Sequence, residues 1–173
     1  MNNQDTNRLA FWDGRSTLGI AAGSGDINLK LLEIKAIQGH IQNYTNVLDA
    51  GCGNSYTLEA LANEHKSVNF FGFDYSPGMV TEAQKYLIEK SLDERVKICR
   101  GNLLDPPFTQ LQFLGAPKNG FDCVFTERSI INLNTLEDQI SAILHLWKLL
   151  RPGGQMILCE SFLDGLNEIN YYR

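Results

Sequence analysis

Two glycines and one carboxylate lie where two short apolar runs end, a pattern typical of a nucleoside-binding site. The run Val47-Leu-Asp-Ala50 leads into Gly51-Cys-Gly53, where glycines allow a tight turn and a close approach of the backbone to a ligand. The next run ends at Phe73 and is followed by Asp74, about 20 residues after the loop, the offset at which an acidic side chain meets ribose hydroxyls. A carboxylate can accept hydrogen bonds from both hydroxyls. The two features together predict a site for a nucleoside-bearing ligand.

The loop lacks the signatures of two common nucleotide sites. A dinucleotide loop requires the pattern G-x-G-x-x-G, and Tyr56 occupies the position of the third glycine, where helix and strand must pack closely. The pattern G-x-x-x-x-G-K-[ST] of a phosphate-binding loop does not occur in the sequence. Binding of NAD or ATP through such loops is therefore disfavoured.

Further polar residues follow the later apolar runs. Glu127 and Arg128 follow the run Phe121–Phe125 after Thr126, where a second ligand would be expected. Glu127 is a candidate general base, and an ion pair that shapes the loop is an equal alternative. Glu160 ends the fifth run, where structural hydrogen bonding is as reasonable as catalysis.

The four cysteines, Cys52, Cys99, Cys123 and Cys159, lack the spacing of a metal site or a redox pair. Three of them lie in apolar runs, where free cysteine behaves as a small hydrophobic residue, so we expect no metal. The amino terminus, Met1–Arg8, is polar, and no apolar run approaches the roughly 18 residues of a membrane span. These features predict a soluble protein of a reducing compartment, the cytoplasm, with no membrane partner.

Short apolar runs alternate with helical patterns from residue 47 onward. This alternation predicts an α/β fold: a Rossmann-like, doubly wound and mostly parallel sheet with helices on both faces. Only the connection 101–120, which is rich in proline and glycine, is expected to be mostly loop. The predicted strands are Val47–Ala50, Val68–Phe73, Val96–Cys99, Phe121–Phe125 and Gln155–Cys159, and the predicted helices are Tyr56–His65, Pro77–Lys90 and Thr135–Leu150.

Residues 1–45 precede this pattern and are predicted to form an N-terminal helical extension. Asp26 is placed to cap a helix whose apolar positions run from Ile27 to Ile41. Phe11–Arg15 is expected to be a loop or a short turn. Gly23-Ser-Gly25 makes the extension a candidate lid over the ligand, and a flexible lead into the Asp26 cap is the alternative.

Five blocks in register make the chain resemble the class I S-adenosylmethionine-dependent methyltransferase family. One block alone is common by chance, whereas five in the expected order are specific. The resemblance implies that residues 46–173 form an S-adenosylmethionine-binding domain. The blocks are Val47-Leu-Asp-Ala-Gly-Cys-Gly53, Gly72-Phe-Asp-Tyr-Ser76 followed by Met79, Gly101-Asn-Leu-Leu-Asp105, Phe121-Asp-Cys-Val124 and Leu149-Leu-Arg-Pro-Gly-Gly154.

The resemblance also implies a set of cofactor-binding residues. They are Asp49, Gly51, Cys52 and Gly53 for the methionine part, Asp74 for the ribose, Tyr75 and Met79 for the faces of the adenine, Asn102 and Leu103 for its edge, and Thr126 beside the methionine end. Glu127 becomes the candidate catalytic base for the acceptor. Asp105-Pro-Pro-Phe108 is similar to a tetrad of methyltransferases that act on base or amide nitrogens, but it follows the third run instead of the fourth, so a proline-driven loop is favoured.

The chain departs from the family pattern at two places. Ser55 stands where a third glycine is usual, and we expect only a modest shift in packing because serine is small. The family core closes with an antiparallel hairpin after the fifth strand, and the sequence after Ser161 is too short to supply it. We therefore expect either a truncated version of a longer protein, which we favour, or a partner such as a second copy in a homodimer that covers the edge of the fifth strand.

These observations predict S-adenosylmethionine-dependent methyl transfer to an O, N or C atom of a small-molecule acceptor by in-line displacement. The chain carries 15 basic and 20 acidic residues, a net charge of −5, and has no basic stripe, so a nucleic-acid partner is disfavoured. The alternatives are a non-catalytic cofactor-binding or partner subunit of the same fold, and a nucleotide-sugar or NAD enzyme on the same topology.

Overall fold

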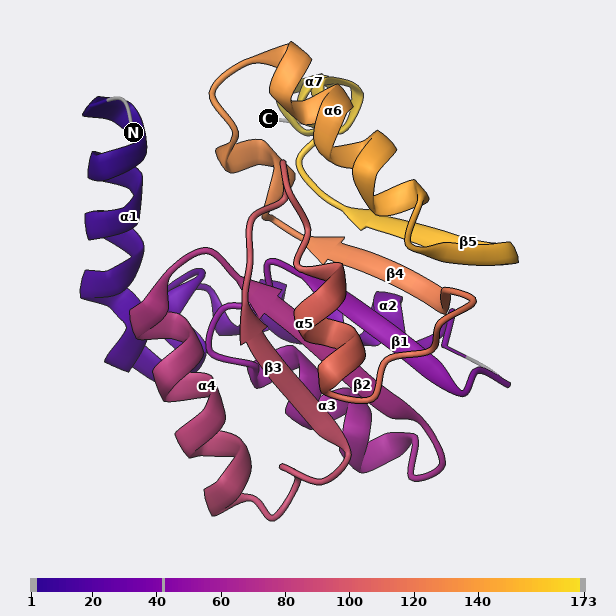
Figure 1. Cartoon of the computed structure of the whole chain (residues 1–173). Coiled ribbons are helices and arrows are strands. Elements are labelled where there is room, and N and C mark those ends of the chain that lie inside the picture. Colours follow the sequence, from indigo (N-terminus) through magenta and orange to yellow (C-terminus); the bar gives the residue numbers. More distant parts are fainter. Residues whose placement is uncertain (1–2, 42, 172–173) are drawn as a thin grey trace.

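A computed structural model describes residues 3–41 and 43–171, and its centre is a five-stranded parallel sheet (Figure 1). The order of the strands is β3-β2-β1-β4-β5. Strands β2 and β3 are thus added on one side of β1, and β4 and β5 on the other, so the strand order reverses between β1 and β4. This arrangement confirms the predicted Rossmann-like α/β fold, in which ligands bind at the carboxyl ends of the strands near the reversal. The strands are β1 (Asn46–Ala50), β2 (Asn69–Asp74), β3 (Val96–Arg100), β4 (Phe121–Glu127) and β5 (Leu150–Cys159).

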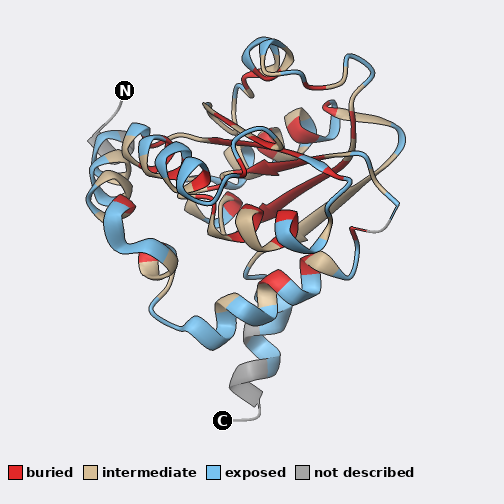
Figure 2. Ribbon diagram, turned by 90° about the horizontal axis from the view of Figure 1, so that it is seen from below, coloured by how far each residue is buried: buried red, intermediate tan, exposed pale blue. Residues whose placement is uncertain are grey.

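Helices cover both faces of the sheet, and the strands β1, β2 and β4 are largely buried between them (Figure 2). Val47 and Phe70 contribute to one core, while their neighbours Leu48 and Phe71 contribute to the other. Successive strand side chains point to opposite faces, so a strand covered on both faces needs a continuous apolar run. The helices of the first core are α2 (Ile27–Gln38), α3 (Tyr56–Glu64) and α4 (Pro77–Glu89), and those of the second are α5 (Phe108–Phe113) and α6 (Leu136–Trp147).

The predicted helix starts are confirmed by their caps. The Asp26 side chain accepts from the backbone N–H of Leu29 at 3.0 Å, and α2 begins at the next residue. Ser76 Oγ accepts from the N–H of Met79 at 3.0 Å, and Pro77 is the first residue of α4.

The prediction that Phe11–Arg15 is a loop or turn is wrong, because these residues end helix α1 (Asn3–Arg15). The helix is followed by the 3₁₀ segment η1 (Ser16–Ala22). Asp13 accepts hydrogen bonds from Ser76 Oγ and, at 3.0 Å, from Gly78 N, so α1 is tied to the amino end of α4. This stabilisation comes from residues distant in sequence, which a local pattern does not reveal.

Further boundaries differ from the prediction. The connection 101–120, expected to be mostly loop, contains helix α5, whose Leu111 is buried in the second core. Strand β5 begins at Leu150, before the predicted Gln155, because its pairing with β4 continues across a register shift at Phe121. The 3₁₀ turn η2 (Ile130–Asn132) follows β4, and helix α7 (Leu163–Tyr171) follows β5.

Strand β5 lies at an edge of the sheet, and no strand follows it within residues 43–171. Across the described ranges, no helix has both the length and the apolarity needed to cross a membrane.

Candidate functional site

A pocket with a volume of about 150 Å³ opens at the carboxyl ends of β1, β2 and β4. Glu127 and all but one of the predicted cofactor-binding residues line it. These residues are Asp49, Gly51, Cys52, Gly53, Asp74, Tyr75, Met79, Asn102 and Leu103.

The exception is Thr126, which is fully buried and does not line the pocket. Strand side chains alternate, so Thr126 points to the face opposite that of its neighbour Glu127. Its position after an apolar run did not indicate which face it would take.

The glycine loop and Asp74 meet directly, as their spacing predicts. Gly53 N donates to Asp74 Oδ2 at 2.9 Å, and Ser76 N donates to Asp74 Oδ1 at 2.9 Å. Burial raises the pKa of Asp74 above its ordinary value, and the backbone hydrogen bonds from Ser76 and Gly53 counteract part of that rise. The loop is fixed to β2 because Gly51 N and Cys52 N both donate to Phe73 O.

The loop also approaches the segment after β4 closely. Gly51 has φ 91°, and a Cβ atom at this position would lie 2.4 Å from the Cβ of Ser129. Ser129 Oγ donates to the carbonyl of Ala50 at 2.8 Å, which holds the two segments together. A side chain at position 51 would therefore push the two walls of the pocket apart.

Ser55, where the family pattern has a glycine, has a left-handed backbone with φ 66°. Its side chain is buried, and its Oγ has no hydrogen-bond partner. The expected effect of this serine was on packing. The structure instead explains by backbone conformation why the family pattern has a glycine here, since glycine adopts this left-handed backbone without strain.

Asp49 lies at the base of the pocket and is 2% exposed, with an Oδ1 atom that has no partner. Burial and the nearby charge of Glu127 raise its pKa well above the ordinary value. A buried acceptor without a donor is unfavourable, and a donor group on a ligand would relieve it.

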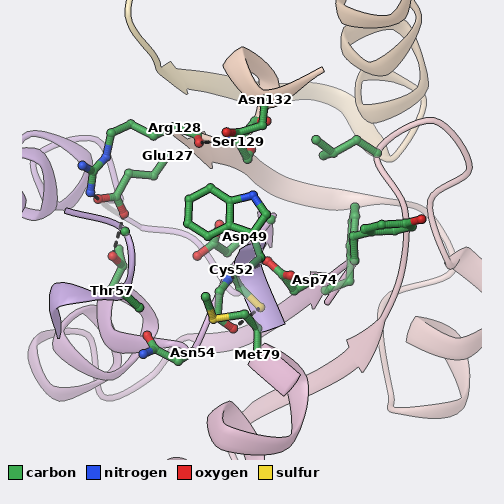
Figure 3. Close-up of a pocket in the computed structure, with 18 of the residues that line it drawn as sticks. Asp49, Cys52, Asn54, Thr57, Asp74, Met79, Glu127, Arg128, Ser129 and Asn132 are labelled. Atoms are coloured by element: carbon green, nitrogen blue, oxygen red, sulfur yellow. Dashed lines mark hydrogen bonds and ion pairs between the residues drawn. The ribbon is translucent and has the colours of Figure 1, made fainter. Parts of the chain in front are cut away.

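Both carboxylate oxygens of Glu127 have partners at the pocket wall. Lys30 Nζ lies 2.6 Å from Oε1. Thr57 Oγ1 donates to Oε2 at 2.6 Å, and Figure 3 shows these two side chains next to each other. Burial alone would raise the pKa of Glu127, but the charge and hydrogen bond of Lys30 and the hydrogen bond of Thr57 lower it overall. Of the two roles that the sequence allowed, this geometry favours an ion pair over a general base. Its partner is Lys30, which the sequence did not single out, and Arg128 Nη2 is more distant, at 3.9 Å.

The N-terminal extension forms one wall of the pocket. Arg8 and Trp12 of α1, Ile20 of η1 and Gly23 all line it, and Figure 1 shows α1 at the carboxyl ends of the strands. Arg8 Nη1 donates to the carbonyl of Asn132 at 2.8 Å, so α1 reaches the segment after β4. The sequence indicated a lid at the glycines near residue 24, but it did not indicate Arg8 or Trp12.

Glu160 has a structural role in this region. Its carboxylate accepts from the backbone N–H groups of Ser129 and Ile130, at 3.0 and 3.1 Å, and holds the turn after β4. Asp105–Pro107 belongs to the connection between β3 and α5, Phe108 is the first residue of α5, and none of these residues lines this pocket. Pro107 instead packs against Gly101, where a Cβ atom would lie 2.5 Å from the proline ring.

Comparison with known proteins gives a family match over most of the chain. A family model described as a methyltransferase domain matches residues 41–168. A demethylmenaquinone methyltransferase of Lactiplantibacillus plantarum is 29% identical over 125 residues, which are 72% of this chain and 48% of that protein. The chain thus spans about half the length of the first curated relatives that it matches.

Solved structures share the fold at lower sequence identity. PH0226 of Pyrococcus horikoshii superposes with a TM-score of 0.63 and 18% identity, covering 78% of this chain and 58% of that one. CalS10, an amino pentose methyltransferase from Micromonospora echinaspora solved with S-adenosylmethionine bound, gives a TM-score of 0.57 and 21% identity, covering 75% and 48%.

Proposed function

Because the chain belongs to the class I S-adenosylmethionine-dependent methyltransferase family, we propose that it binds S-adenosylmethionine in this pocket and methylates an O, N or C atom of a small-molecule acceptor. The observation that carries the proposal is the hydrogen bond from Gly53 N to the Asp74 carboxylate. This hydrogen bond joins the loop whose backbone would approach a ligand to the carboxylate that would accept from ribose hydroxyls. The two meet at the point where the strand order reverses.

The residues of the pocket fit this cofactor. Asp74 is proposed to accept from the ribose hydroxyls, Tyr75 and Met79 to flank the adenine, and Asn102 and Leu103 to meet its edge. Asp49, with its unpartnered oxygen, and the loop Gly51-Cys-Gly53 are proposed to hold the methionine part. Thr126 is left out of this set because it is buried away from the pocket.

The chain is proposed to promote transfer by alignment and exclusion of water. When bound, S-adenosylmethionine supplies an electrophilic methyl group on a sulfonium, so the protein needs to hold an acceptor in line with it. The N-terminal extension, residues 1–45, is proposed to act as the lid: Arg8, Trp12 and Ile20 give the pocket a wall that shields it from solvent. Glu127 is proposed to hold Lys30 in place and not to take a proton from the acceptor, because both of its oxygens are engaged.

The acceptor is proposed to be a small molecule because the named relatives act on small molecules. One relative is a demethylmenaquinone methyltransferase, and one structural neighbour is an amino pentose methyltransferase. The two differ in acceptor chemistry, so the proposal extends to O, N and C acceptors. A cytoplasmic location, the absence of a nucleic-acid partner and a homodimer through the β5 edge remain expectations from the sequence.

The test is calorimetric titration with S-adenosylhomocysteine, followed by transfer of a labelled methyl group to a panel of quinols, phenols and amino sugars. We expect binding in the micromolar range and transfer to one class of acceptor. Binding without transfer to any acceptor would support the alternative of a non-catalytic subunit. Thermal stabilisation by NAD, with none by S-adenosylhomocysteine, would contradict the proposal.

A further inference from the structure

A second pocket lies between the connection that follows β3 and the end of α6. It has a volume of about 280 Å³, which leaves room for a small organic molecule. Figure 1 shows this connection leaving the carboxyl end of β3 and rising toward α6 before it returns to α5. Asp105, Pro106 and Phe108 line the second pocket, so the tetrad Asp105–Phe108, which has no place in the cofactor pocket, forms part of its wall. The site, lined by residues 104–106, 108, 145, 148 and 149, is named here the β3–α6 pocket.

A tight turn separates the β3–α6 pocket from the cofactor pocket. Asn102 and Leu103 line the cofactor pocket, whereas the next two residues, Leu104 and Asp105, line the β3–α6 pocket. The turn is held by hydrogen bonds from Leu104 N to Asn102 Oδ1, at 3.0 Å, and from Asp105 N to Asn102 O, at 3.1 Å. Among the residues that the structure describes, none lines both pockets. A ligand in one pocket therefore does not take the place of a ligand in the other.

The floor of the β3–α6 pocket is apolar. Leu149 is buried in the second core, and Phe108 packs against that core. Leu104 and Pro106 add further apolar surface to the lining. Such a floor binds the apolar part of a ligand, because contact removes apolar surface of both from water.

The polar lining of the β3–α6 pocket consists of one acid, one cation and one histidine. Asp105 and Lys148 are both exposed. Within the described ranges, neither side chain makes an ion pair or a hydrogen bond, so the two charges do not pair with each other. Opposite charges that border one pocket without pairing are complementary to a ligand that carries both charges.

His145 adds a hydrogen-bond donor to this lining. Its Nδ1 is buried and has no partner among the described residues, whereas Nε2 is accessible. A buried N–H without an acceptor is less well tolerated than an unpaired acceptor, so the proton of the neutral ring belongs on Nε2. Lys148 follows three residues later on the same face of α6. The Nε2–H group and the Lys148 ammonium can therefore bind one carboxylate together.

We infer that the β3–α6 pocket binds an α-amino acid with an apolar side chain. Lys148 and His145 bind the carboxylate of this ligand, Asp105 accepts from its ammonium group, and its side chain rests on Phe108 and Leu149. This assignment gives a partner to each polar residue of the lining and covers the apolar floor. It does not rest on the proposed function, because it uses no residue of the cofactor pocket.

The experiment compares L-phenylalanine with analogues that each lack one of its groups. Hydrocinnamate lacks the ammonium group, phenethylamine lacks the carboxylate, and L-serine lacks the apolar side chain. Each is titrated into the full chain while backbone amide shifts are followed by nuclear magnetic resonance. We expect L-phenylalanine to bind with a Kd of about 1 mM or below, and each analogue to bind at least about threefold more weakly, since exposed charges contribute modestly. The shifts should concentrate in residues 104–108 and 145–149.

Two variants test the two charges separately. Lys148→Met should weaken the binding of L-phenylalanine and hydrocinnamate at least about threefold and leave phenethylamine unchanged, because only the first two carry a carboxylate. Asp105→Asn should weaken the binding of L-phenylalanine and phenethylamine but not that of hydrocinnamate. Both side chains are exposed, so the fold should be kept. The matched controls Lys118→Met and Asp93→Asn change exposed residues outside the pocket and should bind every ligand as the wild type does.

Four results would overturn the inference. Equal binding of L-phenylalanine, hydrocinnamate and phenethylamine by the wild type would show that the charges do not recognise the ligand. Equally tight binding of L-serine would show that the apolar floor is not used. Displacement of L-phenylalanine by S-adenosylhomocysteine would place it in the cofactor pocket. No binding up to about 10 mM would exclude this class of ligand.

The inference and the proposed function can fail separately. Asp74→Asn changes the cofactor pocket alone, so it should weaken the binding of S-adenosylhomocysteine and leave the affinity for L-phenylalanine unchanged. Loss of both affinities in this variant would contradict the separation of the two pockets.

Discussion

At the scale of single residues, Asp74 combines a structural and a binding role. Its oxygens accept from Gly53 N and Ser76 N, and lone pairs remain for ribose hydroxyls. In Asp74→Asn, the new amide group would face one of these backbone donors and the acceptor charge would be lost. We expect the affinity for S-adenosylhomocysteine to fall by more than about tenfold in calorimetry. The exposed control Asp93→Asn should keep wild-type affinity, and an unchanged affinity of Asp74→Asn would remove the ribose assignment.

Glu33 gives the protein a predictable response to pH. Burial and the hydrogen bond with Glu127 raise its pKa from 4.5 to about 7, although the charges of Arg128 and Lys30 oppose the rise. The neutral form is therefore favoured in the folded state. The corresponding stability is fully present below about pH 4.5 and is lost as the pH rises toward 7.

Glu33→Gln should remove this part of the pH dependence. Melting temperatures measured by circular dichroism between about pH 5 and pH 8 should fall less steeply in the variant than in the wild type. Parallel curves for the two proteins would mean that Glu33 does not titrate in this range. Asp49 is not among the groups that shift the pKa of Glu33, whereas Glu127 is hydrogen-bonded to it, so the difference between the curves reports the Glu33–Glu127 pair.

Replacing Ser55 by glycine, the residue that the family pattern has at this position, should stabilise the folded chain. Its φ of 66° is strained for serine, and its buried Oγ makes no hydrogen bond that would be lost. Ser55→Gly should add about 1 kcal/mol to the free energy of unfolding, which corresponds to a rise of about 2–4 °C in Tm. Ser67→Gly, at a position without a positive φ, should show no gain. An equal effect of the two substitutions would refute the conformational explanation.

At the scale of elements, Asp13 ties α1 to the amino end of α4, and Arg8 ties it to the segment after β4. Asp13 accepts from Ser76 Oγ and Gly78 N at the amino end of α4, and no other acid does so within the described ranges. Asp13→Ala should weaken the docking of α1 by about 2 kcal/mol, because both donors lose a charged acceptor. Hydrogen exchange in residues 3–15 should become faster, while the strands stay protected. Unchanged exchange in this segment would show that other contacts hold the helix.

The elements that could be predicted from the sequence are those whose determinants are local. The strands were visible as apolar runs, and α2 and α4 were visible through periodicity and the caps Asp26 and Ser76. The meeting of the glycine loop with Asp74 was predictable because both follow parallel strands. Helix α1 was not predictable, because its position is set by a distant contact of Asp13.

The part of the site that the sequence did not predict, the pair of Lys30 and Glu127, also depends on a contact between residues distant in sequence. A lysine on an amphipathic helix usually indicates a solvated face, and nothing near Lys30 in the sequence marks it as the partner of Glu127. Their pairing depends on how α2 packs beside α3 and β4. Glu127 itself was identified by its place after a strand, but its role could be judged only once both of its oxygens were seen to be occupied.

At the scale of the whole molecule, the sheet is asymmetric. The face under α2, α3 and α4 is well covered, whereas β5 lies at an edge and its residues are only partly buried or exposed. Beside it, α6 presents an apolar stripe at helical spacing. The stripe consists of Leu136, Ile140, Leu144 and Trp147, which are 66, 49, 56 and 59% exposed. An exposed apolar stripe beside an unpaired edge favours self-association in water.

Charges placed on the stripe should suppress this association without unfolding the chain. Ile140→Lys/Leu144→Lys replaces two side chains that are about half exposed, so the free energy of unfolding should change by less than about 1 kcal/mol. Light scattering on a concentration series should show less association for the double variant than for the wild type. Ile88→Lys, a single exposed apolar residue on α4, serves as the control and should not change the association. If the control and the double variant behave alike, the α6 stripe is not the associating surface, and the β5 edge must be examined by placing a lysine or proline within β5 itself.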